Sequence, residues 1–280
     1  YTIPDNVINI GDYAFTDCAS LTSVTIPNSV TSIGMFAFTR CTSLTSMMIP
    51  NSVTSFGMYA FSYCSGLTSA AIPNSMTTVG SYAFYFCTGL TNVAIPNSVI
   101  SIGNSAFTRC TSLTSVAIPD SVMSIGNDAF TFCTSLTSMI IPDSVTSIGN
   151  RAFQSCANLT NLTFLGNAPP LGGSVFYNVS GTIYYYYGTT GWGTTYGGLP
   201  TVMMGAPAPQ VGGGSNVGIQ SSNFLFTVSG VVNQTIVVEA STNLINWQPV
   251  WTNTLSGTST NFADLEWTNY TRRFYRVQSW

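Results

Sequence analysis

Cysteine recurs at a spacing of 23 residues, from Cys18 to Cys156, and this period constrains the fold more than any other feature. Ile-Pro pairs keep the same spacing from Ile3-Pro4 onward, and a phenylalanine stands three residues before each cysteine. A fixed period of roughly 20 to 50 residues is typical of solenoids, in which each repeat buries its apolar face only against its neighbours. The period therefore predicts stacked coils over the first part of the chain.

One repeat, residues 21–44, predicts the path of a coil. Val24 and Ile26 alternate with polar residues, which indicates a short strand with one buried face. Pro27 has no N–H to donate and ends this strand in a turn. Val30 and Ile33 lie three residues apart, which predicts a single helical or 3-10 turn.

The rest of the repeat predicts a second short helical segment. Gly34 stands where a helix commonly ends. The apolar positions that follow have the i, i+3/i+4 spacing of a helix. They are Ala37, Phe38, Cys41 and Leu44.

The cysteines themselves favour a column of buried thiols. Equivalent positions on successive coils lie roughly 5 Å apart, whereas the Cβ atoms of a disulfide lie about 3.8 Å apart. Seven is also an odd number of cysteines. Zinc needs ligands that converge tetrahedrally, and the chain has no histidine. We therefore expect hydrophobic packing rather than disulfides or a metal site.

The repeated pattern I-P-x-S-V-x-S-I-G-x-x-A-F-x-x-C-x-x-L resembles the BspA-like subclass of leucine-rich repeats, which occurs in bacterial and protozoan surface proteins. The resemblance covers residues 1 to about 165. It implies a secreted or cell-surface protein whose strands line a concave sheet that binds other proteins. The outward positions of these strands are Ser23, Thr25, Ser46, Met48, Ser69, Ala71, Asn92, Ala94, Ser115, Ala117, Ser138, Ile140, Asn161 and Thr163.

The period fails after residue 165, and the sequence predicts three further parts. Residues 165–204 form an atypical terminal repeat that caps the solenoid within a domain of residues 1–204. Residues 205–218 have the Gly- and Pro-rich composition of a linker. Residues 219–280 contain short alternating runs separated by turns, which predict a small antiparallel β-sandwich. The stretch from Glu239 to Trp247 resembles a C-terminal module of secreted proteins from Verrucomicrobia-like bacteria.

Composition excludes several classes of function. Without histidine or lysine, the chain cannot build Ser-His-Asp, Cys-His or lysine nucleophile systems. The net charge is −3, so there is no basic footprint for nucleic acid. No apolar run is long enough to span a bilayer. We expect no enzyme activity and no cofactor.

Two groups of acids remain as candidates for chemistry. Asp264 and Glu266 share a strand face and could act with Glu239 as a glycosidase pair, but ion pairs with the nearby arginines are favoured. Asp120 and Asp143 occupy one turn position on adjacent coils. They could bind calcium, although Asx-turn chemistry is the favoured explanation.

Two surfaces remain as candidates for binding. Trp247 and Trp251 could form a platform on which a sugar stacks, although such aromatic residues more often belong to the core of a small sandwich. The first coil is expected to expose its apolar cross-section. A capping segment outside this sequence, dimerisation, or head-to-tail docking of the next copy would each cover it, and the sharper hypothesis is that it serves as an assembly end in a filament. Its residues are Tyr1, Ile3, Val7, Ile10, Phe15, Cys18 and Leu21.

These observations predict a β-rich leucine-rich-repeat solenoid with short helical or 3-10 turns, followed by a small all-β sandwich. The predicted function is that of a non-enzymatic, extracellular structural or adhesion protein. It acts through protein contacts, including contacts with its own copies in a filament. The alternative is a monomeric adhesin that binds carbohydrate, a host or a matrix.

Overall fold

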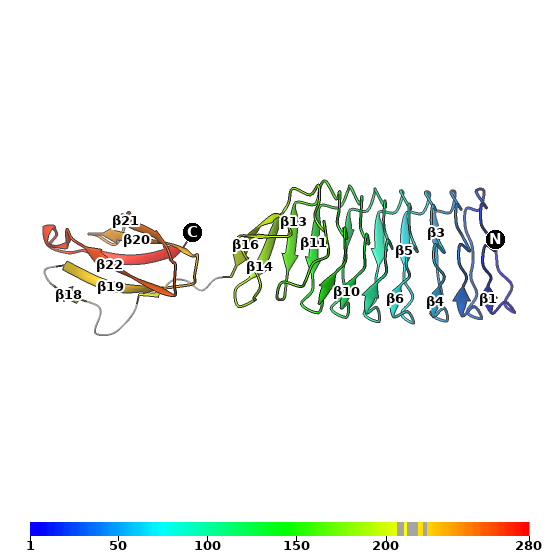
Figure 1. The fold of residues 1–280 in the computed structure, drawn as a ribbon, viewed down its shortest axis with the longest axis horizontal. Coiled ribbons are helices and arrows are strands. Elements are labelled where there is room, and N and C mark those ends of the chain that lie inside the picture. Colours follow the sequence, from blue (N-terminus) through cyan, green and yellow to red (C-terminus); the bar gives the residue numbers. More distant parts are fainter. Residues whose placement is uncertain (206–209, 212–217, 221–222, 280) are drawn as a thin grey trace. The chain divides into compact units, whose positions relative to one another are not determined.

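The computed structural model describes residues 1–205, 210–211, 218–220 and 223–279. The chain divides into two compact units, Tyr1–Met204 and Gly205–Trp280. The first unit is a solenoid of stacked coils, and the second consists of antiparallel strands (Figure 1). The predicted order of a solenoid followed by an all-β unit is confirmed.

The L-x-x-V-x-I segments form the first side of each coil, here named sheet I. Its strands pair in parallel and in register within two runs, one from Ser46 to Val116 and one from Ser138 to Met204. For example, Ser69 pairs with Asn92, and Val93 pairs with Val116. Isolated bridges extend the same side to Thr2 and Thr25. Sheet I consists of β3 (Ser46–Met47), β5 (Ser69–Ala71), β7 (Asn92–Ala94), β9 (Ser115–Val116), β11 (Ser138–Ile141), β13 (Asn161–Phe164), β14 (Thr182–Tyr186) and β16 (Leu199–Met204).

A second strand of two residues follows the Pro turn in the coils up to Ile148, where the sequence predicted a helical turn. These strands form the side here named sheet II, and they pair in parallel in two runs, one from Asn9 to Phe56 and one from Thr78 to Ile148. Sheet II consists of β1 (Asn9–Ile10), β2 (Ser32–Ile33), β4 (Ser55–Phe56), β6 (Thr78–Val79), β8 (Ser101–Ile102), β10 (Ser124–Ile125) and β12 (Ser147–Ile148).

Five of the seven glycines that follow strands of sheet II lie where neighbouring coils approach closely, and Gly11 and Gly80 are the exceptions. A Cβ atom on Gly103 would lie 2.6 Å from the Val79 carbonyl oxygen and 2.7 Å from the Ser81 nitrogen. Such contacts are shorter than real Cβ atoms make. The expectation that Gly34 ends a helix is therefore wrong, because Gly34 directly follows strand β2 and meets the same close approach.

The third side of each coil, here named the turn side, replaces the predicted second helical segment. Two residues per coil, such as Tyr82 and Phe86, adopt left-handed conformations with φ of 58°. The N–H of Tyr82 donates to the Asn104 carbonyl of the next coil at 2.8 Å, whereas the Ala83 N–H donates to Gly80 of its own coil at 3.2 Å. A continuous helix would not offer N–H groups to the next coil in this way.

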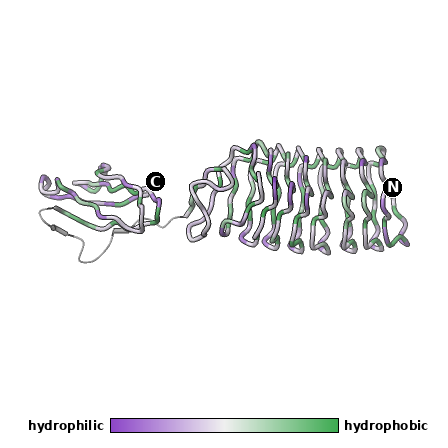
Figure 2. The backbone as a smooth tube through the Cα atoms, viewed as in Figure 1, coloured by the Kyte–Doolittle hydropathy of each residue, from purple (hydrophilic) through white to green (hydrophobic). Residues whose placement is uncertain are grey.

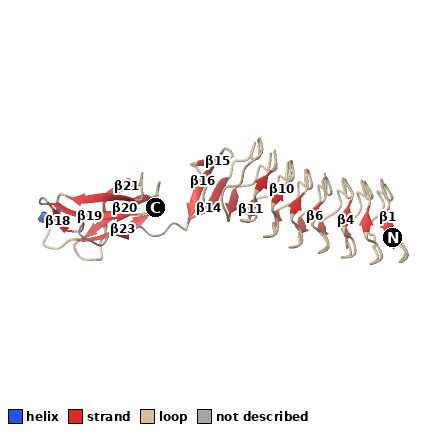
Figure 3. Cartoon of the chain, turned by 60° about the horizontal axis from the view of Figure 1, so that its bottom comes forward, coloured by secondary structure: helices blue, strands red, loops and turns tan. Residues whose placement is uncertain are grey.

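Within the described residues, the only helical element is the 3-10 segment η1 (Trp267–Asn269) of the second unit (Figure 3). The predicted apolar stripe of the repeat is nevertheless buried, since Ala83, Phe84 and Cys87 are fully inaccessible to solvent. Figure 2 shows hydrophobic and hydrophilic segments alternating around the coils of the solenoid.

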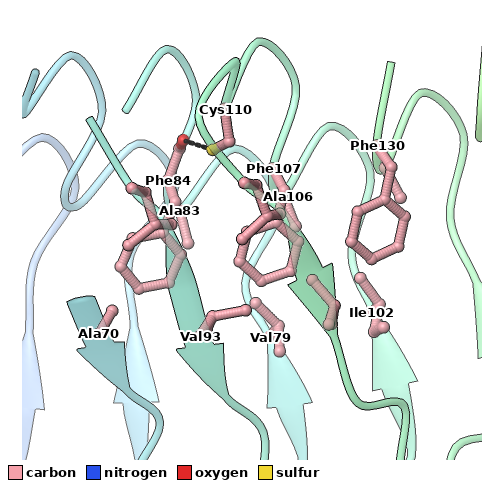
Figure 4. Packing of buried hydrophobic residues seen from close by; sticks show 14 of the residues in the cluster. Ala70, Val79, Ala83, Phe84, Val93, Ile102, Ala106, Phe107, Cys110 and Phe130 are labelled. Carbon is pink, nitrogen blue, oxygen red and sulfur yellow. Dashed lines mark hydrogen bonds between the residues drawn. The ribbon is translucent and has the colours of Figure 1, made fainter. Parts of the chain in front are cut away.

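The solenoid core is built from columns of identical side chains. Eight phenylalanine rings, from Phe15 to Phe176, stack nearly parallel with centroids 5.0–5.8 Å apart. Figure 4 shows Phe84, Phe107 and Phe130 in this column, with Val79 and Ile102 of sheet II beside them. Because each ring packs mainly on its own equivalents, a lone coil has no core of its own.

The cysteines form the column of buried free thiols that the sequence predicts. Six of the seven are buried, and Cys18 in the first coil is exposed. Each buried Sγ donates to the carbonyl of a phenylalanine 26 residues earlier at 3.0–3.2 Å, as Cys110 does to Phe84 (Figure 4). Burial raises the pKa of Cys87 and Cys156 to about 12.

Residues 165–204 continue sheet I and cover its last buried side chains. Strand β14 pairs in parallel with β13 and β16, and β15 (Thr195–Tyr196) turns back antiparallel to β16. The rings of Trp192 and Tyr196 lie 5.1 Å and 5.8 Å from that of Phe164. Together with the buried Leu199 they close this end of the core.

The second unit contains two antiparallel sheets that bury one small core. One sheet contains β17 (Gln210–Val211), β18 (Gly218–Gln220), β19 (Asn223–Ser229) and β22 (Ser259–Asp264), and the other contains β20 (Thr235–Ser241), β21 (Gln248–Thr254) and β23 (Phe274–Ser279). Phe226 and Phe262 from the first sheet meet Ile236 and Val238 from the second.

The predicted linker, 205–218, lies mostly outside the described residues. Its described part differs from a plain linker, because Gln210, Val211 and Gly218 belong to strands that pair with β19. Strand β22 was not identified from the sequence.

The phenylalanine column predicts unequal effects of two equivalent substitutions. Phe107→Ala should lower the free energy of unfolding by about 3–5 kcal/mol, because it leaves a cavity between two stacked rings. Phe15→Ala should cost clearly less, since the Phe15 ring is already half-exposed. Urea unfolding followed by circular dichroism measures both, and equal losses would contradict a core that depends on stacking from both sides.

The thiol column predicts a loss of stability at alkaline pH. Unfolded thiols ionise near their ordinary pKa of 9.0, but Cys87 and Cys156 in the folded chain ionise only near 12. Between these values the unfolded state binds fewer protons, so the free energy of unfolding falls as pH rises. Each thiol should contribute about 1.4 kcal/mol per pH unit in this window.

Urea unfolding at about pH 8 and about pH 10.5 measures this slope. The control is the double variant Cys87→Ser, Cys156→Ser, whose hydroxyls can still donate to the same carbonyls but do not titrate. Its slope should be shallower than that of the parent chain, and identical slopes would rule out the thiols as the cause.

Candidate functional site

The outer face of sheet I is the predicted binding surface, and its residues lie side by side in the structure. Thirteen of the fourteen predicted residues are exposed, and Thr163 is half-buried. The residues between them, such as Val93 and Val116, are buried. Side chains alternate between the two faces of a strand, and this alternation places the predicted set on one face, as the sequence indicated.

This face is uncharged and carries few large side chains. None of its fourteen residues is charged, and Met48 and Ile140 are its large apolar side chains, 86% and 57% exposed. A hollow of about 510 Å³ lies at the start of the face, lined in part by Thr25, Met48 and Asn51. Such a surface offers polar side chains in fixed positions and some apolar contact area. None of its fourteen side chains could act as a general acid or base.

The residues of the predicted assembly end are unequally exposed. Ile3 and Ile10 are buried, at 3% and 4% exposure, and Tyr1 is 65% exposed. The Tyr1 ring lies 5.6 Å from that of Phe15. Val7, Phe15 and Leu21 are half-buried, and Cys18 is exposed.

The two tryptophans of the glycan hypothesis face opposite sides of their sheet. Trp251 packs against the core, with its ring 5.8 Å from that of Phe262. The guanidinium of Arg276 lies 4.6 Å from the centre of the Trp247 ring. The pairing of β20 with β21 shifts between Val238 and Glu239, so Val250 is an extra residue. A bulge of this kind reverses the facing of the residues beyond it.

Two of the three acids of the second unit, Asp264 and Glu239, form the ion pairs that the sequence favours. Glu266 lies beyond the end of β22, so the expectation that it shares a strand face with Asp264 is wrong. The buried Asp264 accepts from Arg273 Nε at 2.9 Å and from the Tyr275 hydroxyl at 2.6 Å. Glu239 accepts from Arg276 Nε at 2.5 Å across the strand pair β20–β23. Burial, together with the neighbouring Asp264, raises the pKa of Tyr275.

The solenoid acids Asp120 and Asp143 are exposed at the turn between the two sheets. In the part of the chain that the structure describes, no cluster of three or more His, Cys, Asp or Glu residues could hold a metal ion. Likewise, none of the described helices is long and apolar enough to cross a membrane.

The repeat region matches a family model described as a BspA type leucine rich repeat region, in six copies, over residues 1–111 and 77–187. The chain belongs to the BspA-type leucine-rich repeat family. The resemblance inferred from the I-P-x-S-V-x-S-I-G pattern is thereby confirmed for the solenoid. The match ends before the second unit, so the likeness of that unit to a Verrucomicrobia-like module stays a prediction.

Solved structures of bacterial leucine-rich repeat proteins share this fold. A leucine-rich repeat protein from Bacteroides ovatus is 31% identical, with a TM-score of 0.55, over 66% of this chain and 54% of its own. A leucine rich repeat protein of T. pallidum is also 31% identical, with a TM-score of 0.52, over 59% of this chain and 77% of its own. This chain thus spans about half the length of the Bacteroides ovatus protein. No curated protein matches it.

Sequence reasoning missed one surface, the exterior of the turn side. Aromatic residues recur there with the same 23-residue period, at Tyr13, Phe36, Tyr59 and Tyr82. The signal was present in the sequence, but only the apolar stripe that follows these positions, such as Ala37, Phe38 and Cys41, was interpreted.

Proposed function

We propose that this chain is a non-enzymatic extracellular protein with a structural or adhesive role, and that it binds partner proteins through the outer face of sheet I. The observation that supports this most is the face itself, in which thirteen uncharged residues are exposed on strands held in parallel register. A surface that is already ordered loses little conformational freedom when a partner binds. Membership of the BspA-type family supports both contact between proteins and a place at the cell surface.

Self-association into a filament is a specific form of this proposal, and the composition supports it. Charged residues make up 5% of the chain, lysine is absent and the net charge is −3. Copies with so little charge repel one another weakly. The neutral sheet I face and the first coil are the two surfaces through which copies would associate.

A charge placed on the sheet I face tests the proposal. Ala94→Arg should reduce association of the secreted chain by about tenfold, because an arginine in a dry contact must lose its hydration. Thr78→Arg places the same side chain on an exposed position of sheet II and is the matched control. Sedimentation velocity and negative-stain electron microscopy measure self-association, and binding of labelled chain to the producing cells measures adhesion.

Two outcomes would contradict the proposal. If Ala94→Arg and Thr78→Arg have equal effects in both assays, the contact does not depend on the sheet I face. If the unmodified chain is a dispersed monomer of 29.8 kDa, the filament form is wrong, and adhesion through the same face is tested by cell binding alone.

The glycan hypothesis concerns a different unit and has its own test. Trp247 is half-buried beneath Arg276, so a sugar could reach only the outer part of this ring. If the second unit binds carbohydrate there, Trp247→Ala should abolish signals on a glycan array. Trp251→Ala would instead lower stability, since Trp251 packs on the core. An array without binding, or one unchanged by Trp247→Ala, would exclude this platform.

A further inference from the structure

The turn side of the solenoid carries a column of stacked aromatic rings on its surface. The rings of Tyr13, Phe36, Tyr59 and Tyr82 follow one another with centroids 5.1, 4.8 and 4.3 Å apart and interplanar angles of 8°, 3° and 20°. All four residues adopt left-handed conformations, with φ between 55° and 60°. Tyr13 is 59% exposed, and the other three are partly exposed.

A second column lies four residues further along each coil and combines aromatic rings with arginines. Tyr63 stacks on Phe86 at 4.9 Å. The guanidinium of Arg109 lies between two rings, 5.0 Å from the centre of Phe86 and 4.5 Å from that of Phe132. The guanidinium of Arg40 lies 5.8 Å from the Tyr63 ring at the other end of the column.

Tyr85 joins the two columns into one surface. Its ring meets those of Tyr59 at 6.0 Å, Tyr63 at 5.6 Å and Tyr82 at 5.7 Å, each nearly edge-on. Burial among these rings raises the pKa of Tyr59 and Tyr85. We name this surface the aromatic face, and it comprises Tyr59, Tyr63, Tyr82, Tyr85, Phe86 and Arg109.

Folding of the turn side does not require these aromatic residues. The next two coils place Ser105 and Asp128 at the position of Tyr82, with nearly the same φ of 53° and 55°. The buried phenylalanine column continues unchanged beneath them, as the rings of Phe107 and Phe130 show. Exposed apolar surface costs free energy in water, and a contiguous patch of it is typical of a binding site.

Arg109 differs from the other arginines of the solenoid because it has no acidic partner. Arg40 lies 3.5 Å from Asp17, and Arg151 lies 2.9 Å from Asp128. Among the described residues, Arg109 is exposed and forms no ion pair; its contacts are the two rings that hold its guanidinium in place. A guanidinium held in this way presents fixed donors to a carboxylate from outside.

We propose that the aromatic face binds an acidic segment of a partner protein, with a carboxylate of the partner on Arg109 and its apolar side chains against the tyrosine edges. Tyrosine and arginine are the residues that most often dominate the binding energy of protein interfaces. The positive charge on Arg109 requires that the bound segment of the partner carry negative charge. This site lies on a different side of the coil from the sheet I face, and it goes beyond the function proposed above.

Two alternative occupants fit less well. A sugar stacks its C–H groups on the negative face of an aromatic ring, but the inner rings of Phe36 and Tyr59 have both faces covered by their neighbours. A second copy that docked with the same face would bring Arg109 toward another Arg109, which is unfavourable between like charges.

The test uses the full chain and defined polymers as probes. Immobilised copolymer of glutamate and tyrosine should bind the parent chain, and poly-lysine should not. Arg109→Gln should weaken this binding by about tenfold or more, because the carboxylate loses its charged donor. Tyr82→Ser should also weaken it, and this change reproduces the residue found naturally at Ser105 of the next coil.

Arg151→Gln is the matched control, since it removes the same charge from the turn side at a position already paired with Asp128. It should leave binding unchanged, as should Thr78→Arg on sheet II. Biolayer interferometry measures the affinities, and thermal unfolding of each variant verifies that it is folded.

Several results would overturn the proposal. They are absence of copolymer binding, unchanged binding by a folded Arg109→Gln variant, and an equal loss with Arg151→Gln, which would indicate general charge attraction. Competition by polygalacturonate at the same concentration as the copolymer would indicate an anionic polysaccharide instead of a protein. Failure of the sheet I test leaves these results unaffected, because the two sets of variants lie on different sides of the coil.

Discussion

Backbone hydrogen bonds between neighbouring coils are the interaction on which the rest of the solenoid depends. Both sheets form parallel ladders, and on the turn side alternate N–H groups donate to the following coil, as Phe84 does to Ala106 at 2.9 Å. These ladders hold adjacent coils about 5 Å apart. A side chain at any position therefore lies directly beside its equivalent 23 residues away.

Only residues that pack well against themselves can be repeated at such positions. In this solenoid, phenylalanine rings stack on one another, cysteines donate to a carbonyl of the neighbouring coil, and glycine occurs where the backbones of two coils approach closely.

The same constraint acts on the surface and accounts for the scarcity of charge. Two like charges at equivalent positions would lie side by side, and this is destabilising. Where charges do recur on the turn side, they alternate in sign along the column, as in the pairs Asp17–Arg40 and Asp128–Arg151. Neutral amides can repeat without this cost. The side-chain Oδ1 of Asn127 accepts from the Asn150 backbone N–H at 2.7 Å, and Oδ1 of Asn104 accepts from the Asn127 backbone N–H at 2.8 Å.

The sequence predicts what depends on side-chain pattern and misses what depends on neighbouring coils. Burial of Val93, Phe84 and Cys87 follows from the repeat alone. Strand β8 (Ser101–Ile102) does not, because its two residues are extended only through pairing with the coils on either side. The left-handed conformations of Tyr82 and Phe86 also cannot be predicted from the sequence, because the apolar residues beside them have the spacing of a helix. In the second unit, the sequence analysis grouped Trp247 and Trp251 in one platform, and the extra residue Val250 places them on opposite faces.

The division between a constant interior and a variable exterior also explains how one solenoid can present two chemically different surfaces. The outer face of sheet I keeps uncharged side chains in every coil, most of them small, on strands held in register. On the turn side, the backbone is left-handed at the position of Tyr82 in each coil, whether it carries tyrosine, serine, aspartate or arginine. Aromatic residues occupy this position in the coils of Tyr13 to Tyr82 and polar residues occupy it from Ser105 onward. Since the core beneath does not change across this boundary, packing does not account for it, and the proposed binding of an acidic partner segment gives the aromatic residues a reason to be there.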